Sequence, residues 1–171
     1  MKQDTLRPGD LVVAVSAAIH RPARLSQLAE SSGRSIGEAH NAVRRLRAGG
    51  LMDAQTRAVD VEAFAQFVVW GIPVAFPAQR GEVTVGTITA VPLIPPTAPE
   101  SSEWVWPDAE GTTRGTAIIP LHSQVPSVAR RDPRMHAALA LIDLSRTGST
   151  RDRAAAAAGL ESLLRSGVSR V

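Results

Sequence analysis

Apolar residues recur at helical spacing in three successive segments of the first fifty residues. Residues 11–19 are almost continuously apolar and follow Asp10, whose side chain is suited to capping a helix. They predict a buried first helix. Apolar positions over residues 25–29 predict a second helix of about two turns, which Gly33 ends.

The third segment carries the clearest local signal. Ser35 and Glu38 match the S-x-x-E capping box, which satisfies unpaired backbone amides at a helix start. A helix is therefore expected from Ile36 to Ala48, with the glycines at 49–50 supplying the left-handed stop. Residues 51–59 predict a short β-hairpin with a polar tip.

A fourth helix is expected over residues 61–70, capped by Asp60. From residue 73 onward the helical periodicity stops, and Gly, Pro, Thr and Val become frequent. Residues 83–91 predict one or two short strands, and the proline-rich residues 92–100 predict a loop. Residues 104–106 and 115–119 flank a turn-rich stretch and predict a second hairpin.

The last third returns to helical periodicity. Asp132 and Pro133 predict the start of a helix over 134–146, and Ser149 or Thr150 predicts the cap of a last helix that runs to Arg165. The two helices are expected to form an antiparallel hairpin. Its apolar sector is wide enough to suggest an assembly surface, and its members are Met135, Ala138, Leu139, Leu141 and Ile142.

These elements indicate an α+β protein: an N-terminal winged helix-turn-helix followed by a smaller β-hairpin plus helical C-terminal domain. The expected boundaries are 1–72 for the winged helix-turn-helix, 73–125 for a β-rich connecting region and 126–171 for a C-terminal helical hairpin. The hairpin would serve dimerisation or a protein partner.

Composition narrows the function classes. The 171 residues contain no cysteine, which excludes disulfides and Cys-based zinc sites. No apolar run is long enough to cross a bilayer, so a cytoplasmic protein without a membrane role is expected. Residues 20–50 carry six arginines against two glutamates, a local charge of +4 where an anionic partner would dock.

Two stretches within residues 10–59 carry a family resemblance. They are LSQLAE over residues 25–30 and VRRLRAGGL over residues 43–51. This region resembles the MarR-like winged helix-turn-helix regulators of bacteria. The resemblance implies a transcriptional regulator that binds double-stranded DNA, and two short recognition helices in a homodimer would match two half-sites.

The third helix supplies the candidate contacts. On a wheel of about 100° per residue, Ile36, Ala39, Val43 and Leu46 form one stripe, and the opposite face is centred on Asn41. Asn suits adenine, while Arg suits guanine or phosphate. His40 and Arg47 fall nearer the core flank. The predicted DNA contacts are Arg24, Arg34, Ser35, Gly37, Asn41, Arg44, Arg45 and Arg57.

Catalytic signals are missing from the sequence. Residues 81–86 have the glycine spacing of a phosphate loop, but no Lys-Ser/Thr pair follows them. The four histidines are scattered, and no G-x-S-x-G elbow occurs. Neither enzymatic activity nor a cofactor or metal is expected. Trp104 and Trp106 are expected to belong to a second core, with a ligand platform as the alternative.

Three other functions stay open. A winged helix also serves as a docking scaffold in protein-interaction adaptors. Residues 114–160 resemble the tail of bacterial winged-helix proteins associated with toxin–antitoxin or phage-defence operons, which implies an antitoxin-like component. A small-molecule sensor using the two tryptophans is the third.

Overall fold

The computed structural model describes residues 4–90 and 103–166, and these residues form eight helices and three strands. The protein is therefore a mixed helical and β protein, as the α+β expectation required. In chain order the elements are α1 (Pro8–His20), α2 (Leu25–Ser31), α3 (Ile36–Ala48), α4 (Val61–Trp70), α5 (Ile72–Ala75), β1 (Arg80–Ile88), β2 (Trp104–Pro107), β3 (Thr113–Ile118), α6 (Val125–Arg131), α7 (Pro133–Thr147) and α8 (Thr150–Ser166).

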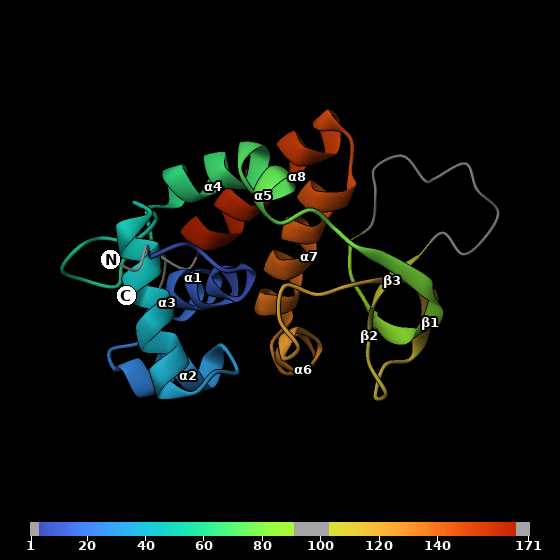
Figure 1. The fold of residues 1–171 in the computed structure, drawn as a ribbon, viewed down its shortest axis with the longest axis horizontal. Coiled ribbons are helices and arrows are strands. Elements are labelled where there is room, and N and C mark those ends of the chain that lie inside the picture. The colour runs from blue at the N-terminus through green and yellow to red at the C-terminus, as the bar shows by residue number, and fades with distance from the viewer. Residues whose placement is uncertain (1–3, 91–102, 167–171) are drawn as a thin grey trace.

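Helix α1 lies at the centre of the main hydrophobic core. Residues 9–19 are all buried, because α2 and α3 contact the helix from one part of the chain and α7 and α8 from another. Figure 1 shows α1, α2 and α3 gathered at one end, the strands at the other, and α7 between them. Side chains from before residue 73 and after residue 120 thus share one core.

The start of α1 differs from the prediction. Pro8 occupies the first turn, where a proline needs no hydrogen-bond donor. The helix therefore begins before Asp10, and Asp10 is not its N-cap. The carboxylate instead accepts the backbone N–H of Arg7 at 2.9 Å from inside the first turn.

The segment after α3 is more compact than a hairpin of two strands. A single antiparallel bridge joins Met52 to Val59. Between them, Oδ1 of Asp53 accepts the backbone N–H groups of Gln55 and Thr56 at 3.0 and 2.6 Å. Because the residues after Asp53 form this Asx-type turn, they cannot also pair as two β-strands. The expected hairpin is therefore limited to one bridge.

The three strands close into a small barrel whose topology corrects the second predicted hairpin. β1 pairs antiparallel with both β2 and β3, while β2 and β3 run parallel to each other. Glycines permit the close backbone approaches. A Cβ atom at Gly86 would collide with the carbonyl oxygen of Trp106, and one at Gly115 would collide with that of Glu103.

Both barrel tryptophans are buried, Trp104 in a second, smaller core and Trp106 in the main one, so the expected second core holds only Trp104. The indole N–H of Trp106 donates to Oδ2 of Asp143 on α7 at 2.6 Å, and Thr89 donates to the same oxygen at 2.9 Å. Arg146 binds the other carboxylate oxygen at 2.6 Å. Asp143 therefore joins the barrel to the helices.

The predicted caps of α7 and α8 are confirmed. Asp132 accepts backbone N–H groups of the first turn of α7, and Ser149 caps α8. Most of the predicted apolar sector of α7 is covered within the chain, because α1, α5, α6 and α8 contact this helix, and Leu141 is partly buried. The buried members of the sector are Met135, Ala138, Leu139 and Ile142. The proline-rich loop predicted over residues 92–100 lies entirely outside the described residues.

Candidate nucleic-acid interface

The start of α3 is built as the sequence predicted. Glu38 accepts the backbone N–H of Ser35 at 2.9 Å, and the backbone N–H of Glu38 donates to Oγ of Ser35 at 3.2 Å. The hydroxyl of Ser35 also donates to the Glu38 carboxylate, at 2.7 Å, and the two hydrogen bonds that Ser35 donates to this carboxylate lower the pKa of Glu38. Gly50 takes the left-handed conformation, with φ of 72°, at the other end. α3 is therefore fixed in length and direction at both ends.

One face of α3 is exposed along its whole length. Its inward residues Ala39, Ala42, Val43 and Leu46 pack into the molecule. The outward row consists of Gly37, His40, Asn41 and Arg44. A side chain at position 37 would meet open space.

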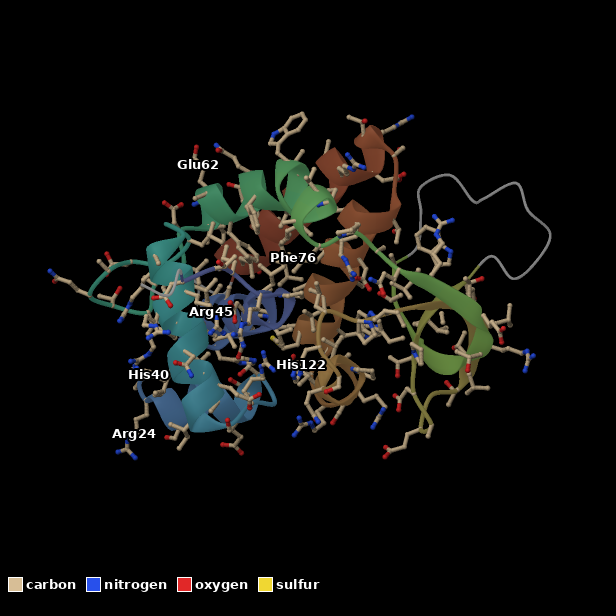
Figure 2. All side chains as sticks on the ribbon, in the orientation of Figure 1. Arg24, His40, Arg45, Glu62, Phe76 and His122 are labelled. Carbon is tan, nitrogen blue, oxygen red and sulfur yellow. The ribbon has the colours of Figure 1, made fainter. Side chains whose placement is uncertain are left out.

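This face is rotated slightly from the predicted one. Ile36, which the wheel places in the core, is 57% exposed, and His40, which it places near the core flank, is exposed. Figure 2 shows His40 projecting outward from α3. His40 lies three residues after Gly37 and four before Arg44, so helical spacing relative to Gly37 and Arg44 could have identified it.

Arg45 is the clearest correction among the predicted contacts. Its Nε and Nη2 donate to the two carboxylate oxygens of Asp10, each at 2.7 Å, and the two side chains are 11% and 0% exposed. The hydrogen bonds with Asp10 raise the pKa of Arg45. Because Asp10 is buried in the first turn of α1, it draws Arg45 away from the outward face.

Two further arginines are also turned inward. The side chain of Arg34 is 7% exposed and lies against Gly9. Arg57 donates through Nη2 to the carbonyl oxygens of Pro22 and Ala23, at 3.4 and 2.5 Å. It therefore ties the segment after α3 to the α1–α2 loop instead of standing at an exposed tip.

The remaining predicted contacts lie on the surface. Arg24 precedes α2 and points outward in Figure 2, on the same side as His40. Arg44 is 58% exposed and pairs with Asp4 at 2.9 Å. Arg47, which is not among the predicted contacts, donates to carbonyl oxygens of the turn that begins at Asp53. The structure thus leaves Ser35, Gly37, His40, Asn41 and Arg44 exposed at the start and on one face of α3, and Arg24 exposed before α2.

No protein-family model, curated protein or solved structure matches this chain. Within residues 4–90 and 103–166, no group of His, Asp and Glu side chains is arranged to hold a metal ion. In the same residues, no helix is long and apolar enough to span a membrane.

Proposed function

We propose that this protein is a DNA-binding regulator of the winged helix-turn-helix type, in which α3 enters the major groove of duplex DNA. One observation carries the proposal: α3 is anchored at both ends and presents Gly37, His40, Asn41 and Arg44 in a single exposed row. The amide of Asn41 suits adenine, and the guanidinium of Arg44 suits guanine or phosphate.

The surroundings of α3 support the same proposal. α2 precedes it across the short turn at residues 32–35, and the Met52–Val59 bridge follows it. Arg24 adds an exposed cation before α2, where it would contact phosphate. The Arg44–Asp4 pair is solvent-exposed, so exchange of the carboxylate for a DNA phosphate costs little. Two copies acting as a homodimer would supply two half-sites.

Substitutions in the row test the proposal by fluorescence anisotropy with duplex DNA. Asn41→Ala or Arg44→Ala should each weaken specific binding by about 1–3 kcal/mol per lost base contact. Neither should change folding, because both residues are exposed. Arg114→Ala is the matched control, since it removes an exposed arginine from β3. Equal affinities for all four proteins would contradict the proposed interface.

A protein-interaction adaptor is the second candidate function. Trp70 and Val74, on α4 and α5, are 72% and 82% exposed. Large exposed apolar side chains that lie close together are typical of protein-binding surfaces. Under this alternative, Trp70→Ser would abolish partner binding while the α3 variants would have no effect.

A further inference from the structure

A pocket of about 300 Å³ lies between the start of α1, α3 and the segment before α6. Arg45 and His122, both labelled in Figure 2, border it from α3 and from that segment. Most of its polar walls are cationic or hydrogen-bond donors. The donor residues of the lining used below are Arg7, Gly9, Arg34, Asn41, Arg45 and His122, and Glu38 adds one carboxylate.

Arg34 is the unusual member of the pocket. Its side chain is 7% exposed, and its Nε has no hydrogen-bond partner among the described residues. Its Nη1 lies 3.6 Å from Glu38, which is longer than a hydrogen bond. Burial lowers the pKa of Arg34, with Glu38 opposing the shift. A buried guanidinium with so few acceptors calls for an anionic ligand.

His122 supplies a second donor. The backbone N–H of Gln124 donates to its Nδ1 at 3.2 Å. Burial, with the charge of Arg34, lowers the pKa of His122. A neutral ring that accepts at Nδ1 carries its proton on Nε2 and can donate from there.

The backbone and the charge balance add to these side chains. Gly9 lies in the first turn of α1 and lines the pocket. Pro8 has no N–H, and the N–H of Asp10 donates to the carbonyl oxygen of Arg7 at 2.9 Å, so the N–H of Gly9 is the backbone donor that this turn offers beside the pocket. A Cβ at Gly9 would occupy the place of the Arg34 guanidinium, so glycine permits this packing. Arg45 is already neutralised by Asp10, and Glu38 offsets one cation, which leaves Arg7 and Arg34 with a net charge of one.

We propose that this pocket binds inorganic phosphate or a small phosphorylated compound, held by Arg34, His122 and the backbone N–H of Gly9. The volume is at the lower end of ligand sites, which suits inorganic phosphate or a small phosphorylated compound. The near-complete burial of Arg34 favours a diffusible ion over a backbone phosphate of a rigid duplex. Asn41 borders both this pocket and the outward row of α3, so the anion would lie beside the proposed DNA contacts.

Titration with inorganic phosphate tests the pocket without DNA. In calorimetry against chloride at matched ionic strength, the full chain should bind phosphate saturably, and thermal unfolding should shift upward. Arg34→Gln should weaken the affinity at least tenfold, while Arg114→Gln should leave it unchanged. Absence of saturable binding by the unsubstituted chain would overturn the proposal, and so would equal binding by Arg34→Gln.

A second variant tests the pocket if Arg34→Gln does not fold. His122→Ala then replaces it, and phosphate binding unaffected by that substitution would overturn the proposal.

DNA binding distinguishes a free phosphate ion from a phosphate of the DNA backbone. DNA binding of Arg34→Gln in phosphate-free buffer should equal that of the unsubstituted chain. Loss of DNA binding by this variant, with no phosphate binding by the unsubstituted chain, would assign the pocket to a DNA phosphate and overturn the free-ion proposal. Failure of the DNA proposal alone would leave the phosphate titration intact.

Discussion

Replacing Asp10 with alanine is expected to lower the free energy of unfolding by about 3–5 kcal/mol. The substitution removes both acceptors of Arg45, which is buried beside α1. A buried charge without its partner is strongly destabilising, because its lost hydration is not compensated by an opposite charge or by hydrogen bonds. The backbone N–H of Arg7 loses its acceptor in the same variant. Urea denaturation measures the change.

The neighbouring ion pair is the matched control. Asp4 contacts Arg44 at 2.9 Å, but these side chains are 36% and 58% exposed. Asp4→Ala should therefore cost less than about 1 kcal/mol. Asp10→Leu combined with Arg45→Met should recover most of the loss, because it removes both buried charges together. Equal costs for Asp4→Ala and Asp10→Ala would contradict the assignment of Arg45 to the fold.

Asp143→Ala is expected to cost a similar amount, about 3–5 kcal/mol. It removes the acceptor shared by Trp106 and Thr89, together with the carboxylate that Arg146 binds. All of these groups are buried or nearly so, and they come from the barrel and from α7. The junction between the barrel and the helices should open first, which hydrogen exchange of β1 and β2 would detect.

Asparagine at position 143 separates charge from hydrogen bonding. Asp143→Asn keeps an acceptor for Trp106 and Thr89 but turns an amide NH2 toward Nη1 of Arg146, which keeps the carbonyl oxygens of Phe76 and Ile119. Its cost should therefore be smaller than that of alanine. A cost equal to that of alanine would show that the negative charge itself is required.

The pH dependence of the free energy of unfolding provides a second test of Asp143→Asn. Burial raises the pKa of Asp143, with Arg146 opposing. A raised pKa in the folded state contributes stability below the pKa of the unfolded chain, and that stability is lost as pH rises through the folded-state value. Asp143→Asn should remove this part of the pH profile.

Local signals allowed much of the helical structure to be predicted. The caps at Ser35, Asp60, Asp132 and Ser149 act over a few residues, so the sequence around each contains the whole signal. α6 was missed although Pro126 stands in its first turn, a position that favours proline. The preference of proline for the first turn could have indicated this helix, but seven residues are too few to show a clear helical periodicity of apolar positions.

Non-local contacts explain the remaining errors. Arg45 and Asp10 are 35 positions apart, and a wheel drawn for α3 alone cannot show that Asp10 is buried beside it. Arg57 likewise contacts the loop after α1. The parallel arrangement of β2 and β3 depends on β1, which pairs with both. The row of α3 was therefore predicted in part, with His40 omitted and Arg45 wrongly included.

The most direct measurement of the central claim is selection from a pool of random duplex DNA. The full chain, held at about 50 mM salt where phosphate contacts are strong, should enrich a common short sequence, and Asn41→Ala should lose the preference for one base of it. Binding should weaken with salt, with a slope of about −0.9 per phosphate contact. A folded protein that retains no duplex above background would contradict the account of α3 as a DNA-reading helix.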